Sequence, residues 1–364
     1  MAQNERIGER VGDRLGAMIY PANPLPAQFV DRVRPKLAGQ RVCVTGGAGF
    51  IGGHIIDALI AMDALVTVID DLSNSSVGHI ASVIDQAPDR IQFIQSSILD
   101  PKALASAMEG SQAVFHLAAL GSVPKSVEDP ARTWVVNATG TMRVLMAAKE
   151  AGVQRVVYSA SSSAYGNNPE LPKVESMAPE PESPYAAAKY GGESLIRTWA
   201  ACYGIDAISL RYFNIFGTRQ AADSAYAAVI PAFVTKFLRN ESPTIFGDGE
   251  QTRDFTHVSN AVAANLLAAS AEQQLGGQVV NVGAGVRTSV NQLAQMIAKI
   301  LGKEDIKVNY APERVGEVRD SVSSIDRAKE VIGYESMTSL EVGLEETVNW
   351  YADQWKRTND QGDN

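Results

Sequence analysis

The chain contains little cysteine and carries an excess of negative charge. Its 364 residues include two cysteines, Cys43 and Cys202, and the formal net charge is -9. Cys43 falls within an apolar run typical of a strand, so a disulfide scaffold is not expected and the thiols suit a reducing compartment. The acidic balance argues against a general nucleic-acid or membrane-surface binder, although it leaves room for a local basic pocket. We predict no metal site.

Long hydrophobic runs are also missing. No stretch of about 18 apolar residues occurs, and the first residues lack a basic start followed by a continuous apolar segment. We therefore expect a cytoplasmic protein without membrane contacts. With 45% hydrophobic and 20% charged residues, the chain is long enough to bury a large core and to form two lobes.

Residues 1–38 are predicted to form an arm that precedes the main fold. Ile7, Val11, Leu15 and Ile19 recur every four residues among charged side chains, which predicts one amphipathic helix. Three prolines between positions 21 and 26 predict an extended segment after it. The pattern is compatible both with packing on the main body or a second subunit and with a solvated appendage. Residues 353–364 are predicted to form a polar tail.

From Arg41 onward, short apolar segments alternate with segments of helical length. This alternation predicts a doubly wound α/β fold of the Rossmann type, with a parallel sheet covered on both faces. After about residue 215 the placement of glycine and proline changes, which indicates interleaved segments of a smaller α/β lobe. The β-rich segments lie at 42–44, 65–69, 91–94, 113–115, 155–158, 207–210 and 279–282.

A glycine-rich turn follows the first predicted strand. Gly46, Gly49 and Gly52 permit a tight turn, a close approach of the backbone to a pyrophosphate and close helix packing, while free N–H groups at the helix start attract the anion. Asp70 ends the second strand and is placed to accept hydrogen bonds from a ribose, although aspartate is also a common turn residue. Together with Asp71 it would repel a 2'-phosphate, which favours NAD over NADP.

Tyr185 and Lys189 lie four residues apart, on one face of a predicted helix. Tyrosine has an unperturbed pKa near ~10, and a nearby cation favours its phenolate. We therefore expect Lys189, with the positively charged nicotinamide ring, to lower the pKa of Tyr185. The pair is a short motif that a surface helix also carries by chance. Its value comes from the glycine turn and from the three serines at 161–163.

Together these motifs resemble those of extended short-chain dehydrogenases/reductases of the nucleotide-sugar epimerase group. The resemblance covers about residues 40–352. It implies an NAD-binding Rossmann domain at 40–214 plus about 256–283, and a UDP-sugar-binding lobe at about 215–255 plus 284–352. Beyond the glycine turn and the Tyr-Lys pair it rests on H-L-A-A at 116–119, Asn137, S-S-S-A-Y-G at 161–166, R-Y-F-N at 211–214 and G-D-G-E-Q-T-R-D-F at 247–255.

The resemblance implies a UDP-sugar 4-epimerase. Tyr185 would take the proton of the sugar 4-hydroxyl as hydride passes from C4 to enzyme-bound NAD, and the 4-keto sugar would turn over and take the hydride back on its other face. No net oxidation results, so the cofactor would stay bound. Lys189 would hold the nicotinamide ribose, and Ser161 would hydrogen-bond the reacting oxygen, with Ser163 as the alternative.

Two positions separate this chain from related enzymes. Ser162 and Ser163 stand where nucleotide-sugar dehydratases carry Asp and Glu, because loss of water needs an additional acid and base. Dehydration is therefore disfavoured, and so is the related decarboxylation that relies on that Glu. Ser97 stands where many relatives have an aspartate that contacts adenine, so the adenine contact would lack that charge.

Sugar choice depends on Ser321, the position of a gatekeeping side chain in the family. A bulky tyrosine there is typical of enzymes limited to simple hexoses, whereas a small residue leaves room for an N-acetyl group. The segments 120–126 and 220–231 also resemble the subgroup that acts on UDP-N-acetylhexosamines. We hypothesise interconversion of UDP-N-acetylglucosamine and UDP-N-acetylgalactosamine, with UDP-glucose and UDP-galactose as a second candidate pair.

Other functions stay open. A 4-epimerase for UDP-glucose or for a UDP-uronic acid is the near alternative. A net NAD-dependent sugar-nucleotide oxidoreductase and a non-catalytic NAD-binding protein are less favoured. Family analogy also predicts a homodimer that pairs through two helices of the NAD-binding domain, one of them carrying the Tyr-Lys pair.

The resemblance also assigns the binding residues. Arg253 and Arg314 would grip the diphosphate through their planar donors, although a single arginine is more often part of a surface ion pair. The residues expected to bind NAD are Gly46, Gly49, Phe50, Ile51, Gly52, Asp70, Asp71, Asn74, Ser97, Ile98, Leu117, Ala118, Ala119, Asn137, Tyr185, Lys189 and Tyr212. Those expected to bind the UDP-sugar are Ser122, Ser161, Ser162, Tyr185, Asn214, Gln220, Ala228, Val229, Arg253, Arg314 and Ser321.

Overall fold

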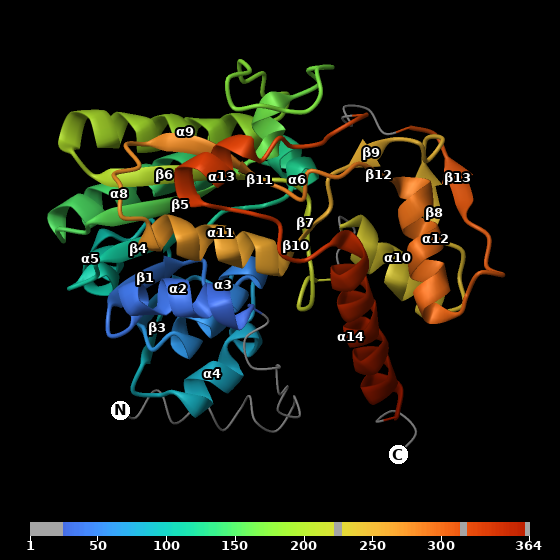
Figure 1. The fold of residues 1–364 in the computed structure, drawn as a ribbon, viewed down its shortest axis with the longest axis horizontal. Helices are drawn as coiled ribbons and strands as arrows, with labels where there is room; N and C mark the ends of the chain where they lie inside the picture. Colours follow the sequence, from blue (N-terminus) through green and yellow to red (C-terminus); the bar gives the residue numbers. More distant parts are fainter. Residues whose placement is uncertain (1–24, 222–227, 314–318, 361–364) are drawn as a thin grey trace.

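The computed structural model describes residues 25–221, 228–313 and 319–360, and a seven-stranded parallel sheet is its central element (Figure 1). The strand order is β11-β6-β5-β4-β1-β2-β3, and all neighbours pair in parallel. This confirms the predicted Rossmann-type α/β fold. The strands are β1 Arg41–Thr45, β2 Leu65–Asp70, β3 Ile91–Gln95, β4 Ala113–His116, β5 Arg155–Ser161, β6 Asp206–Tyr212 and β11 Gln278–Val282.

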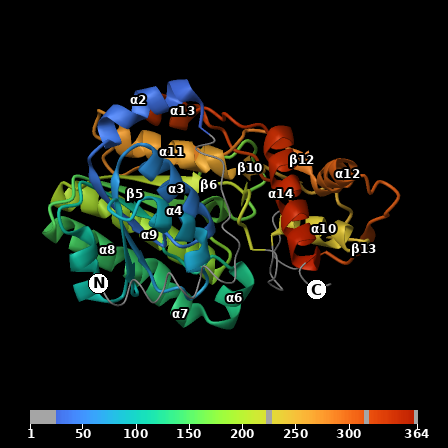
Figure 2. The same cartoon turned by 90° about the horizontal axis from the view of Figure 1, so that it is seen from below.

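Helices cover both faces of the sheet, which explains why its central strands are apolar throughout (Figure 2). On one face, α2 (Ala27–Leu37), α3 (Phe50–Ala61), α11 (Val258–Ser270) and α13 (Asp326–Ile332) contribute to the main hydrophobic cluster. On the other face, α5 (Pro101–Met108), α8 (Gly140–Glu150) and α9 (Pro184–Tyr203) form a second cluster. In β1, Val42, Cys43 and Val44 are fully buried between these layers.

A third hydrophobic cluster lies beside the sheet, on the right of Figure 1. It contains Phe216, Ile245 and the apolar faces of α10 (Val229–Leu238), α12 (Val290–Leu301) and α14 (Leu340–Asp360). The other elements are α4 Ala81–Gln86, α6 Val123–Glu128, α7 Pro130–Trp134, the 3-10 turns Val77–His79 and Ser162–Tyr165, the π-helical turn Val135–Thr139, β7 Ile215–Phe216, β8 Thr244–Phe246, β9 Thr252–Arg253, β10 Thr256–His257, β12 Thr288–Ser289 and β13 Asn309–Ala311.

The predicted arm and tail differ from the structure at their inner boundaries. Phe29, Val33 and Leu37 recur every four residues along α2 and are buried in the main core, so from residue 25 the chain is part of the sheet's cover rather than an arm. The helix predicted around 7–19 lies outside the described residues. At the other end, α14 continues through most of the predicted tail, to Asp360.

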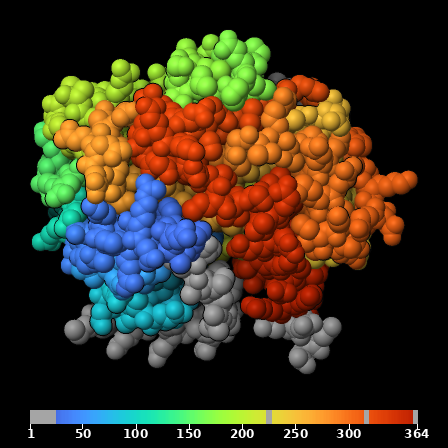
Figure 3. Space-filling model, in the orientation of Figure 1, coloured from blue at the N-terminus to red at the C-terminus, as the bar shows by residue number. Residues whose placement is uncertain are grey.

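Helix α13 belongs to the main body, although the sequence placed 284–352 in the smaller lobe. Ala328 and Ile332 are buried in the main cluster, and Arg327 donates a hydrogen bond to the Val279 carbonyl of β11. Helices α2 and α13 therefore meet on one face, where a Cβ on Gly333 would lie 2.6 Å from Arg32 Nη2. In Figure 3 the blue surface of the N-terminal segment borders the red surface of the C-terminal segment. Within the described residues, none of the helices is long and apolar enough to cross a membrane.

Candidate active site

A single cavity of about 1030 Å³ runs along the carboxyl ends of the central strands and continues toward α10 and β8. This edge of a doubly wound sheet is the usual place for a bound nucleotide. The cavity is lined at one end by the glycine turn and Asp70, in the middle by Ser161, Tyr185 and Lys189, and at the other end by Arg253. Segments far apart in the sequence thus form one continuous site.

The glycine turn fits a pyrophosphate. Gly46 has a φ of +70°, and a Cβ there would lie 2.5 Å from the Ala118 nitrogen, so only glycine fits. A Cβ on Gly52 would lie 2.4 Å from the Gly46 oxygen. Gly49 caps α3 without a side-chain hydrogen bond. The first N–H groups of α3, which line the cavity, are therefore available to an anion.

Asp70 connects this turn to the loop that follows β2. Its Oδ2 accepts from the Ala48 N–H at 3.0 Å, and its Oδ1 accepts from the Leu72 N–H at 2.9 Å and from the Ser75 hydroxyl at 2.8 Å. Three donors fix the carboxylate at the cavity wall, beside Asp71 and Asn74. This is the place at which the fold type binds an adenosine ribose.

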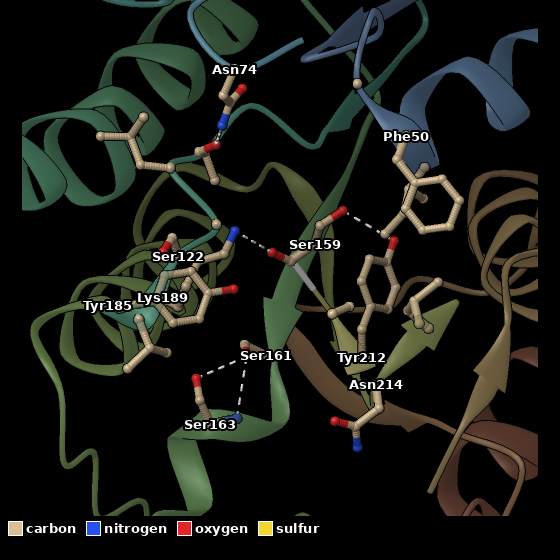
Figure 4. A pocket seen from close by; sticks show the side chains of 18 of the residues that line it. Phe50, Asn74, Ser122, Ser159, Ser161, Ser163, Tyr185, Lys189, Tyr212 and Asn214 are labelled. Carbon is tan, nitrogen blue, oxygen red and sulfur yellow. Dashed lines mark hydrogen bonds between the residues drawn. The ribbon is translucent and has the colours of Figure 1, made fainter. Parts of the chain in front are cut away.

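Ser161 and Ser163 are hydrogen-bonded to each other at the end of β5 (Figure 4). The Ser161 Oγ accepts from both the N–H of Ser163, at 3.2 Å, and its hydroxyl, at 2.8 Å. Because both lone pairs of Ser161 are used, its own proton is available to another oxygen. Tyr185 lies in the first turn of α9, whose N-cap Ser183 accepts from the Ala186 N–H.

Lys189 is oriented toward β5. It is buried, and its Nζ donates a 2.7 Å hydrogen bond to the Ser159 carbonyl (Figure 4). Burial lowers the pKa of Lys189 to about 7. Burial also raises the pKa of the Tyr185 phenol, and only a hydrogen bond with Ser161 opposes this rise. Among the protein groups, loss of hydration dominates both side chains and raises the Tyr185 pKa, against the lowering predicted from Lys189 and the nicotinamide together.

Tyr212 closes the middle of the cavity from β6. Its hydroxyl lies 3.0 Å from the Ser159 Oγ and accepts from Asn265 Nδ2 at 2.6 Å. These bonds fix the ring at the cavity wall, next to Phe50 in Figure 4. Tyr212 thus contributes a rigid wall, and its hydroxyl is already engaged by the protein.

The far end of the cavity combines a cation with a fixed backbone. Arg253 Nη1 donates to the carbonyls of Thr252, at 3.0 Å, and Arg319, at 2.9 Å, while the Ser321 N–H donates to the Thr252 carbonyl at 3.1 Å. The buried Asp254 next to Arg253 accepts from the N–H and hydroxyl of Ser323, at 3.0 and 2.6 Å. Arg253 and Ser321 are therefore held on a common support.

An apolar slot adjoins that end. Val229, Ala232 and Phe233 of α10 and Ile245 and Phe246 of β8 line this part of the cavity. Such a slot suits the flat face of a base, next to a diphosphate held by arginine.

Among the described residues, one predicted site residue is not part of the cavity lining. Asn137 lies in the buried π-helical turn and makes two hydrogen bonds with the backbone of Leu120, to the N–H at 2.8 Å and to the carbonyl at 3.1 Å. It supports the wall instead of forming it. Arg314 lies outside the described residues. The remaining predicted site residues all line the cavity.

The sequence prediction missed several lining residues. Gln251 lies inside the G-D-G motif, and its Nε2 donates to the Phe246 carbonyl at 2.6 Å. Its position between the glycines of the motif and Arg253 was a signal from which Gln251 could have been predicted as a lining residue. Lys173 is buried in a loop and lines the cavity beside Ser321, but no motif surrounds it. Ser159 was also missed, because its contribution is a backbone carbonyl.

Comparison with known proteins identifies the family. The model of the NAD dependent epimerase/dehydratase family matches residues 42–283. The chain is 36% identical over 313 residues to a UDP-glucose 4-epimerase of Mycolicibacterium smegmatis, covering 85% of this chain and 98% of that protein.

Two solved structures have the same fold at substantial identity. One is a UDP-N-acetylglucosamine 4-epimerase from Methanobrevibacter ruminantium M1 in complex with UDP-N-acetylmuramic acid, with a TM-score of 0.81, 39% identity and coverage of 87% of this chain and 100% of that one. The other is a UDP-glucose 4-epimerase from Thermotoga maritima with UDP-glucose, with a TM-score of 0.81, 37% identity and the same coverage. The chain is therefore an enzyme of the NAD dependent epimerase/dehydratase family, and its cofactor is NAD.

Proposed function

We propose that this enzyme is a UDP-sugar 4-epimerase that interconverts UDP-N-acetylglucosamine and UDP-N-acetylgalactosamine. The observation that carries the proposal is the single cavity, which joins the glycine turn to the Ser161 and Tyr185 pair and then to Arg253 and Ser321. A dinucleotide and a nucleotide sugar would meet at Tyr185. The similar enzymes from Methanobrevibacter ruminantium and Thermotoga maritima, both named as 4-epimerases, support the reaction class.

The catalytic groups have separable tasks. Tyr185 would move a proton to and from the sugar 4-oxygen, and the Ser161 hydroxyl would donate to that oxygen because Ser163 occupies both of its lone pairs. NAD, when bound, supplies the reversible oxidation at C4. Lys189 would provide positive charge at the buried centre, held in place by the Ser159 carbonyl.

The residues beside Tyr185 favour epimerisation over loss of water. Ser162 and Ser163 carry no carboxyl group, and the Ser163 hydroxyl already donates to Ser161. An elimination needs an acid and a base at the neighbouring carbons. The site offers neither at these positions, so the 4-keto stage would revert to a sugar alcohol.

The small side chain at Ser321 favours an acetylated substrate. Ser321 lines the cavity, and its backbone is fixed by the Thr252 carbonyl, so its position leaves space where a tyrosine would fill it. UDP-glucose and UDP-galactose would fit the same space less closely. They form the second pair to be tested.

The decisive experiment uses purified protein without added cofactor. Incubation with UDP-N-acetylglucosamine should give its C4 epimer, detected by NMR or by chromatography, without accumulation of NADH. Conversion of UDP-glucose alone, or of UDP-glucuronic acid alone, would assign the near alternatives. NADH that rises in proportion to substrate would indicate a net oxidoreductase.

We also propose that the enzyme is a homodimer that pairs through α6, α7 and α9. Trp134, at the end of α7, is 50% exposed and packs over Gly191 of α9, while Val127 of α6 is 65% exposed. Apolar surface of this kind is typical of a subunit interface. Light scattering should give twice the mass of one chain, and Trp134→Lys should shift the protein toward monomer.

A further inference from the structure

Four buried residues are linked by a linear series of hydrogen bonds behind the cavity wall. The Thr45 Oγ1 lies 2.7 Å from His116 Nδ1, and His116 Nε2 lies 2.9 Å from the Thr141 Oγ1. Thr141 in turn donates to the Asn137 carbonyl at 2.6 Å. All four residues are at most 1% exposed. These hydrogen bonds run from β1 through β4 to Thr141 of α8 and on to the π-helical turn.

The donor and the acceptor of each hydrogen bond in this series follow from the last group, the Asn137 carbonyl. A carbonyl only accepts, so the Thr141 hydroxyl gives its proton to Asn137 and must accept from His116 Nε2–H. His116 Nδ1 is then an acceptor, and the Thr45 hydroxyl donates to it. Burial and the charge of Lys189 lower the pKa of His116 to about 3, in agreement with this neutral form.

Both ends of this series reach the same loop. The Thr45 Oγ1 accepts from the Ala118 N–H at 3.3 Å, and the Asn137 side chain holds both backbone groups of Leu120. Ala118 and Leu120 line the cavity, and Ala118 is the residue against which Gly46 packs. The loop is therefore fastened at two points to one buried histidine.

We propose that His116 is a positioning residue for NAD, which fixes residues 118–120 against the glycine turn through Thr45 on one side and Thr141 on the other. His116 does not line the cavity itself. Its imidazole is suited to this task because it can accept at one nitrogen while donating at the other. The inference rests on NAD binding in the cavity and is independent of the sugar.

The test compares three threonine variants. Thr141→Val removes the acceptor for His116 while keeping the shape, and Thr141→Ser keeps the hydroxyl. Thr347→Val is the matched control, because Thr347 is also buried in a helix and donates to the carbonyl four residues earlier, at 2.6 Å to Gly343, and does not line the cavity. The readout is the dissociation constant of NAD for protein freed of cofactor, with the NAD content as purified as a second measure.

Thr141→Val should weaken NAD binding about tenfold, the effect of leaving one buried donor without an acceptor. The dissociation constants of NAD for Thr141→Ser and Thr347→Val should stay within about twofold of the wild-type value. The double variant His116→Leu with Thr141→Val should bind NAD no more weakly than His116→Leu alone, because the two residues act through the same hydrogen bond. Wild-type affinity in Thr141→Val, or an equal loss in Thr347→Val or Thr141→Ser, would overturn the proposal. None of these measurements requires epimerase activity, so a different sugar substrate would not affect them.

Discussion

The ammonium of Lys189 and the carbonyl oxygen of Ser159 are joined by a 2.7 Å hydrogen bond between α9 and β5. This bond is buried in the core. Among the described residues, the Ser159 carbonyl is the hydrogen-bond acceptor for the Lys189 ammonium. The free energy of burying a cation there opposes folding. The proposed catalytic centre should therefore destabilise the protein when NAD has been removed.

Lys189→Met should make the NAD-free protein more stable. The pKa of Lys189 is lowered from 10.5 to about 7 in the folded state. Between these pH values the unfolded chain binds more protons, so wild-type stability rises with pH across that window. The variant lacks this cost, and its advantage should be about 3 kcal/mol at pH 6, after subtraction of the lost hydrogen bond, and smaller at pH 10. Denaturant unfolding at both pH values tests this, and an advantage that grows with pH would contradict it.

Tyr185→Phe should reduce epimerisation by about 10³-fold, because proton transfer to the sugar oxygen loses its acid and base. The NAD content should stay unchanged, since the ring remains in place. Tyr203→Phe, at the exposed end of the same helix, is the control and should retain full activity. Comparable activity in the two variants would remove Tyr185 from the mechanism.

Ser321→Tyr should act selectively on the acetylated pair. The added ring would occupy the space beside Arg253, and kcat/KM for UDP-N-acetylglucosamine should fall at least about tenfold more than kcat/KM for UDP-glucose. Ser321→Ala keeps the space and should preserve the ratio. An equal loss on both pairs would show that Ser321 is not the selective position.

The buried ion pair between Glu193 and Arg211 allows a second test of how charge near Lys189 affects stability. Glu193 lies one turn beyond Lys189 on α9 and accepts two hydrogen bonds from Arg211 of β6, at 2.8 and 2.6 Å. Glu193→Gln leaves a buried guanidinium without its counter-charge and should cost about 3–5 kcal/mol of unfolding free energy. Adding Arg211→Met should recover much of this loss. A double variant as unstable as the sum of the single ones would contradict the pairing.

Local patterns in the sequence predicted the parts of the site that depend on the backbone. Gly46 and Asp70 could be found because a tight turn and a strand end leave signatures within a few residues. The orientation of Lys189 could not be predicted, since it depends on which carbonyl of β5 meets α9 after packing. Asn137 was assigned to the cofactor site. Its position in a π-helical turn, where its amide bonds the backbone of Leu120, could not be predicted because no local sequence pattern marks such a turn.

The lobe boundaries show the same limit. Helix α2 was hidden by the prolines around it, although its buried residues follow a helical period. Helix α13 was assigned by its position in the chain, whereas Arg327 and the buried Ala328 attach it to β11. Periodicity identifies a helix, but it does not say which sheet the helix will cover.

The order of segments in the large sheet has a consequence for synthesis. β11 covers the open edge of β6, and α13 then covers β11, yet both are made after α10 and β8 of the other cluster. Until residues 278–332 have left the ribosome, the edge of β6 is an unpaired strand beside uncovered apolar surface. A chain stopped near residue 215 should therefore aggregate, and the large sheet can be completed and covered only after residue 332 has left the ribosome.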